Sequence, residues 1–109
     1  MTKNKYNEIL KLKTLLEEAA IPFIGRNVYD GYQIVIYHKV DETVLCDAIE
    51  HSFTYGSEVD RLEIQGAITL EETKDDSVLG YLTAEEVFKR FKFCYDNNVF
   101  IYLDKEVKK

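Results

Sequence analysis

Apolar residues recur along the first twenty positions with the spacing of an amphipathic helix, and charged residues fall mostly between them. The positions that keep the i, i+3, i+4, i+7 rhythm are Ile9, Leu12, Leu15, Leu16 and Ala19. The pattern predicts a helix over roughly Asn4–Ala20. Ile21-Pro22 ends it, because a residue before proline avoids the helical region.

Beyond Pro22 the chain becomes β-prone, with Asp30-Gly31 between two runs rich in aromatic and β-branched residues. Such a pair is typical of a type I′ hairpin turn, in which both central residues have positive φ. We therefore expect strands at about 22–29 and 32–38. Ile34 and Ile36 share one face of the second strand, and the other face is also apolar, which favours a place inside the sheet.

Two further runs complete a predicted antiparallel meander. The first covers 43–51 and alternates imperfectly, with Cys46, Ala48 and Glu50 on one side. The second covers 61–65, with apolar residues facing inward at two alternate positions. A long connection, which contains one glycine, joins these two strands.

Two capping boxes follow, at Thr69–Glu72 and Thr83–Glu86. The first predicts one helical turn and the second a full helix that stops at Asn97-Asn98. The run 99–103 is strongly β-prone and offers a fifth strand. We expect one α+β domain over 1–109, with an antiparallel four- to five-stranded sheet, N- and C-terminal helices packed on one face, and a frayed tail at 105–109.

Composition fits a core that needs neither disulfide nor metal. Of 109 residues, 46% are apolar and fourteen are Phe or Tyr. The polar N-terminus and the lack of a long apolar run predict a cytoplasmic protein without a signal peptide or membrane span. There, Cys46 and Cys94 are expected as reduced, buried thiols.

Charge is concentrated in one segment. Residues 41–86 hold thirteen acidic and two basic side chains, a balance of −11 within a net charge of −6. Such a field attracts basic partners and disfavours direct binding of nucleic acid. Glu71, Glu72, Asp75 and Asp76 could imitate a phosphate backbone for a basic partner. The alternative is a solvated loop beside helix N-termini, where acids are favoured.

No phosphate-binding, dinucleotide-binding, nucleophile-elbow or zinc-protease motif is present. The histidines and cysteines lack metal-ligand spacing, so no metal or cofactor is expected. Each cysteine lies in an apolar pattern, which raises a thiol's pKa and favours an inert role.

The connection after the third strand is the best candidate ligand site. It gathers His51, Ser52, Tyr55 and Ser57, which could bind a small polar ligand such as a nucleotide. Phosphate groups would then meet one of two arginines, Arg26 or Arg61. The structural alternative makes His51 a surface residue, the glycine of this connection (Gly56) a turn requirement and its phenylalanine (Phe53) a plug under the sheet.

Several runs carry a resemblance to a known group of proteins. They are 46–58, which reads CDAIEHSFTYGSE, then Leu62–Gly66, Asp76–Phe88 and the hairpin around Asp30-Gly31. Over roughly residues 5–92 the chain resembles small proteins encoded by phages and prophages of Gram-positive bacteria. The run at 99–103 departs from that pattern. The resemblance implies a compact protein that acts in the host cytoplasm by occupying a defence complex, a signalling nucleotide or a transcription factor.

The leading hypothesis is therefore a non-catalytic binding protein that inhibits a host antiviral defence system. It would dock an acidic surface on a basic, nucleic-acid-handling protein, or sequester a nucleotide signal, with homo-oligomerisation left open. One alternative is a small hydrolase or transferase using His51 with Glu50 or Asp47 as acid and base. Another is a phage structural or assembly protein that pairs through sheet edges.

Overall fold

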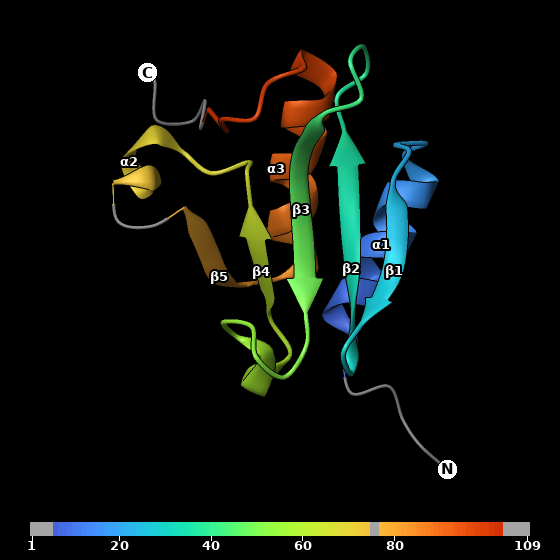
Figure 1. The fold of residues 1–109 in the computed structure, drawn as a ribbon, viewed down its shortest axis with the longest axis vertical. Coiled ribbons are helices and arrows are strands. Elements are labelled where there is room, and N and C mark those ends of the chain that lie inside the picture. Colours follow the sequence, from blue (N-terminus) through green and yellow to red (C-terminus); the bar gives the residue numbers. More distant parts are fainter. Residues whose placement is uncertain (1–5, 75–76, 104–109) are drawn as a thin grey trace.

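The computed structural model describes residues 6–74 and 77–103 of the chain. Its core element is a five-stranded antiparallel sheet whose strands lie side by side in chain order (Figure 1). The strands are β1 (Ile24–Val28), β2 (Gly31–Tyr37), β3 (Val44–Glu50), β4 (Leu62–Gln65) and β5 (Val78–Leu82). The predicted antiparallel meander and the α+β class are confirmed.

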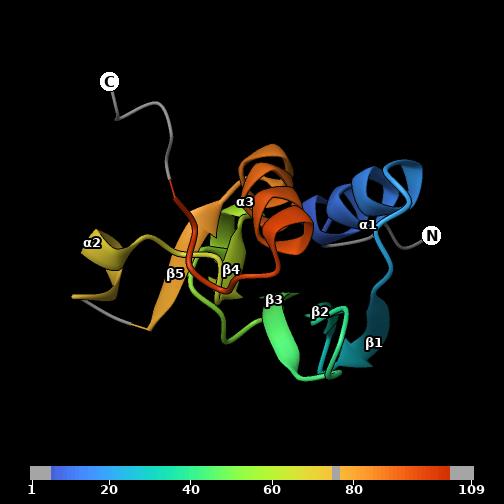
Figure 2. The same cartoon turned by 90° about the horizontal axis from the view of Figure 1, so that it is seen from above.

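Two long helices, α1 (Glu8–Glu18) and α3 (Ala84–Asn97), cover one face of the sheet and leave the other face open (Figure 2). We call the uncovered side the open face. The core lies between the helices and the sheet, as predicted. Its fully buried side chains include Ile9, Leu12, Leu16, Ile34, Ile36, Leu62, Ile64, Val87 and Phe91.

The start of α1 is fixed by a residue far along the chain. Asn4, the predicted start, lies outside the described residues, and the helix begins at Glu8. Asn7 makes no side-chain cap. Instead, Asp60 Oδ1 accepts hydrogen bonds from the backbone N–H groups of Asn7 at 2.8 Å and Glu8 at 3.1 Å. A carboxylate from the β3–β4 connection therefore caps this helix.

Both predicted capping boxes are confirmed. Thr69 and Glu72 exchange hydrogen bonds at the start of α2 (Leu70–Thr73), and Thr83 and Glu86 do so at the start of α3. Asn98 adopts the left-handed conformation, with φ 60°, and ends α3 as predicted.

The β1–β2 turn differs from the predicted type I′ turn at Asp30-Gly31. The two central residues are Tyr29 and Asp30, and only Tyr29 has positive φ, at 55°. Gly31 pairs with Val28 as the first residue of β2. A Cβ atom on Gly31 would lie 1.7 Å from the carbonyl oxygen of Glu50, so the glycine is required by close packing of β2 on β3 rather than by the turn.

The fifth strand is not the one predicted. The run 99–103 forms only an isolated parallel bridge between Ile101 and Ile68, and β5 (Val78–Leu82) pairs with β4 instead. β5 is short and contains Gly80, which weakens its local signal. A Cβ atom on Gly80 would lie 2.4 Å from Tyr55 Cβ, so this glycine lets β5 approach the β3–β4 connection.

Within the described residues, no helix combines the length and apolar character that crossing a bilayer requires.

Candidate functional site

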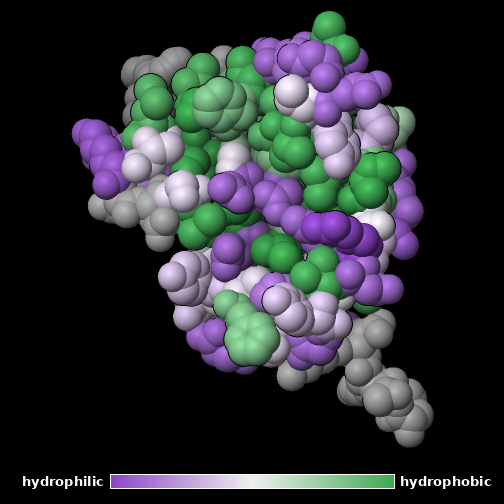
Figure 3. All heavy atoms as spheres, viewed as in Figure 1, coloured by the Kyte–Doolittle hydropathy of each residue, from purple (hydrophilic) through white to green (hydrophobic). Residues whose placement is uncertain are grey.

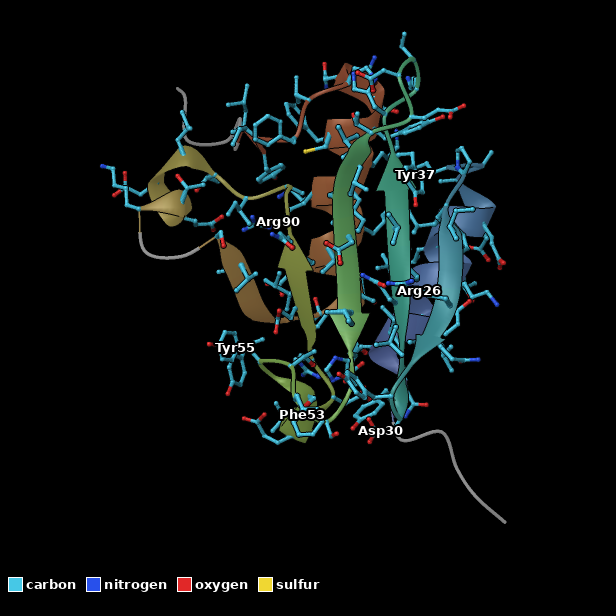
Figure 4. All side chains as sticks on the ribbon, viewed as in Figure 1. Arg26, Asp30, Tyr37, Phe53, Tyr55 and Arg90 are labelled. Atoms are coloured by element: carbon cyan, nitrogen blue, oxygen red, sulfur yellow. The ribbon has the colours of Figure 1, made fainter. Side chains whose placement is uncertain are left out.

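Four exposed aromatic rings gather at the end of the sheet where β1 meets β2 and β3 meets β4. Tyr29 and Phe53 are each 78% exposed, Tyr55 is 55% exposed and Tyr81 is 56% exposed. We call these four residues the aromatic end. Figure 4 labels Phe53 close to the Asp30 turn and Tyr55 nearer to β5. Large exposed rings close together on a small protein mark an interaction surface.

Ring contacts and one short helix hold this end in place. Tyr29 and Phe53 pack edge to face, with centroids 5.7 Å apart. The Tyr81 N–H donates to the Tyr55 carbonyl at 3.4 Å, which ties the connection to β5. The turn before η1 (Ser57–Val59) places Gly56 at φ 100°, so Gly56 is the predicted turn requirement.

For His51 and Phe53 the structure shows the opposite of the structural alternative, which made His51 a surface residue and Phe53 a plug under the sheet. His51 is 7% exposed rather than a surface residue, and its ring packs on both Tyr29 and Phe53. Its Nδ1 accepts a hydrogen bond from the Phe53 N–H at 3.1 Å. Phe53 points outward and is no plug under the sheet. His51 thus supports the aromatic rings from below.

The remaining predicted ligand residues do not form one cluster with Arg26. The Ser52 N–H donates to Asp30 Oδ1, and Ser57 begins η1. Arg61 Nη1 donates to the carbonyls of Val59 and Asp60 in its own connection. Arg26 lies on the open face, where its Nε donates to Gln33 (Figure 4).

The aromatic end carries negative charge. Glu58 accepts a hydrogen bond from the Tyr81 hydroxyl at 2.7 Å, and this bond lowers the pKa of Glu58. Glu63 accepts from the Tyr55 N–H at 2.9 Å. Because both donors are neutral, neither bond cancels a carboxylate charge. Rings bordered by carboxylates suit a cationic side chain, which can pair with the acid and stack on the ring.

The predicted acidic surface at 71–76 is partly committed to the fold. Arg90 donates to both carboxylate oxygens of Glu72, each at 2.9 Å, and this pairing lowers the pKa of Glu72. Glu71 is exposed and pairs with Lys74 at 3.3 Å. Asp75 and Asp76 lie outside the described residues. Glu72 therefore helps to hold α2 against α3.

A group of three carboxyls, two of them buried and one partly exposed, lies behind the aromatic end, where β3 meets the starts of both long helices. It comprises Glu8, Glu50 and Asp60, and we call it the carboxyl junction. Glu8 Oε1 accepts from the Ala84 N–H at 2.6 Å, at the start of α3. Burial acts to raise the pKa of Asp60. The hydrogen bonds that its carboxylate accepts from the backbone N–H groups at the start of α1 outweigh burial and lower this pKa.

Glu50 is the unusual member of the carboxyl junction. It is fully buried, and neither carboxyl oxygen has a hydrogen-bond partner of normal geometry among the described residues. Burial raises its pKa to about 9, and the adjacent Asp60 carboxyl adds to the rise. Glu50 therefore holds a proton at neutral pH. One sequence signal pointed here: Glu50 shares a strand face with Cys46 and Ala48.

The acid–base pairs considered from the sequence are not hydrogen-bonded to each other among the described residues. No hydrogen bond joins His51 to Glu50 or Asp47, and the described part of the chain holds no cluster of three potential metal ligands. Both cysteines are free and buried, as predicted. Burial raises the pKa of the Cys46 thiol, and that of Cys94 to about 12.

The open face carries a second feature, a shallow groove of about 330 Å³ across β1, β2 and β3. Apolar side chains gather at one end of it, and polar side chains cross its middle (Figure 3). The lining residues are Ile24, Arg26, Gln33, Val35, Tyr37, Val44, Asp47 and Gln65.

Comparison with protein-family models, with curated proteins and with solved structures finds no match to this chain.

Proposed function

We propose that this protein is a non-catalytic binding protein that inhibits a host antiviral defence system by docking on a basic, nucleic-acid-handling partner. The observation that supports the binding role is the aromatic end, where four exposed rings lie at one end of the sheet and two of them, Tyr55 and Tyr81, hydrogen-bond to the carboxylates of Glu63 and Glu58. The defence context comes from the resemblance to phage-encoded proteins. We place the docking surface at the aromatic end and not at the acidic surface expected from the sequence, of which Glu72 is paired with Arg90.

The charges at the aromatic end favour a basic protein over a nucleotide. A phosphate bound between the rings would meet Glu58 and Glu63, whose charges repel it. The nearest arginine of this connection, Arg61, directs Nη1 to backbone carbonyls. A lysine or arginine of a partner would gain both carboxylate pairing and contact with a ring face.

The test measures phage plating on a host that carries a defence system, with and without expression of this protein. We expect the wild type to restore plating and the double variant Phe53→Ala/Tyr55→Ala to lose most of that effect. The matched control is Phe100→Ala, which removes an aromatic ring that is 61% exposed outside the aromatic end. Equal loss by the control and the double variant would contradict the assignment of this surface.

Binding to the recovered partner should follow the same pattern. Loss of two central aromatic contacts is expected to weaken affinity by roughly 30-fold or more. Electrostatic docking also predicts that binding weakens steeply as salt rises. Calorimetric titration with cyclic and ADP-ribose-type nucleotides tests the competing version. Heat of binding that His51 and Tyr55 variants abolish would replace the protein partner with a nucleotide.

A further inference from the structure

The open face holds a contiguous block of apolar side chains, which is unusual for a sheet face in contact with water. Ile24 pairs with Val35 across β1 and β2, and Tyr37 pairs with Val44 across β2 and β3. Ile24 is 55% exposed, Tyr37 39% and Val44 58%. The solvent side of an antiparallel sheet normally carries polar residues at such positions. A contiguous apolar block there indicates a surface that a partner covers.

A hydrogen-bonded polar chain crosses the same face beside this block. Arg26 Nε donates to Gln33 Oε1 at 2.7 Å, and Gln33 Nε2 donates to Asp47 Oδ2 at 2.8 Å. A positive group on β1 and a negative group on β3 thus lie on either side of a neutral amide on β2. Among the described residues, the Nη groups of Arg26 and the Oδ1 atom of Asp47 make no hydrogen bond or ion pair. Arg26 and Asp47, at the two ends of this hydrogen-bonded row, therefore each keep charged atoms that can contact a partner.

We infer that the open face binds a second copy of this chain, face to face, about a two-fold axis that runs approximately along β2. Such an axis places β1 of one copy over β3 of the other. Arg26 then faces Asp47 of the second copy, and the same contact forms again through symmetry. Gln33 faces its own equivalent, and the two apolar blocks meet beside these pairs.

Charge complementarity selects a second copy over other occupants. A uniformly basic partner would pair with Asp47 but repel Arg26, and an acidic partner would do the reverse. A second copy satisfies both charges at once. Arg26 and Asp47 are offset by one row in the strand register. The crossing of about 30° between sheets packed face to face, together with the length of the arginine side chain, lets the two charged groups meet. The inference is independent of the proposed function, because the aromatic end lies outside this face.

The test uses two charge-reversal variants, Arg26→Glu and Asp47→Arg, with sedimentation or light scattering as the readout. The wild type is expected at twice the chain mass of 12.7 kDa. Each single variant brings like charges together twice, so its dimer should weaken by at least about tenfold. Mixing the two variants restores both opposite-charge pairs, and a dimer containing one copy of each should form.

Far-UV circular dichroism and thermal melting test whether each variant is folded. If either charge reversal fails to fold, Val44→Lys replaces it, since Val44 is exposed and its change leaves the core intact. This variant should be monomeric. The inference is overturned if the wild type stays monomeric at its highest soluble concentration. It is equally overturned if folded single variants remain dimers, or if the mixture of monomeric variants forms none.

Discussion

Replacing Glu50 with glutamine should change how the stability of this protein depends on pH. Glu50 is fully buried, and burial raises its pKa from an ordinary 4.5 to about 9. Between these values the folded protein holds a proton that the unfolded chain has released. The stability of the wild type therefore falls as pH rises through this interval, because the folded state binds more protons.

One proton gives a slope of about 1.4 kcal/mol per pH unit when the full effect is expressed. Solvent screens part of this effect, because Asp60 in the carboxyl junction is partly exposed. We therefore expect the wild type to lose roughly 1–2 kcal/mol of unfolding free energy between about pH 6 and pH 8 through this group. Carboxyls with lowered pKa, such as Asp60, Glu58 and Glu72, titrate below this window.

The Glu50→Gln variant keeps the shape of the neutral acid and cannot ionise. Its stability should match that of the wild type to within about 1 kcal/mol near pH 5.5 and exceed it near pH 8. Urea unfolding followed by circular dichroism across this pH range measures the unfolding free energy of the wild type and of the variant. Glu18→Gln, the same change at an exposed position of α1, is the control and should leave the pH dependence unaltered. If the difference in unfolding free energy between the wild type and Glu50→Gln does not change with pH, the assignment of a buried, protonated Glu50 is refuted.

Three further changes test the packing. Gly31→Ala should destabilise the fold by about 3 kcal/mol or more, because its Cβ would collide with the Glu50 carbonyl oxygen; thermal melting measures this effect. Arg90→Met should lower stability by about 2 kcal/mol, since it leaves the Glu72 carboxylate without its bidentate partner and the Ala67 carbonyl without a donor; urea unfolding gives the value. Both thiols should resist a thiol-specific disulfide reagent in the folded protein and react after unfolding, because burial raises their pKa; rapid labelling of the native protein would contradict this.

The sequence by itself determined the elements whose signals are local. The 3.6-residue apolar period of α1, the two capping boxes and the inward-facing Leu62 and Ile64 each depend on residues a few positions apart. These predictions are confirmed. The sequence also led to the connection that contains Phe53 and Tyr55, because polar and aromatic residues cluster there after a strand.

Only the tertiary structure decided which of those residues face solvent and which segments meet. Asp60 caps a helix that begins 52 residues earlier. Gly80 lets the short strand β5 pair with β4, although the composition of β5 does not favour a strand. His51 is buried and Phe53 is exposed, the reverse of the structural alternative, and both rings contact Tyr29 from the neighbouring β1–β2 turn. Burial raises the pKa of Glu50, and the Asp60 carboxyl of the β3–β4 connection adds to the rise. Such features depend on contacts between distant parts of the chain, which no local pattern encodes.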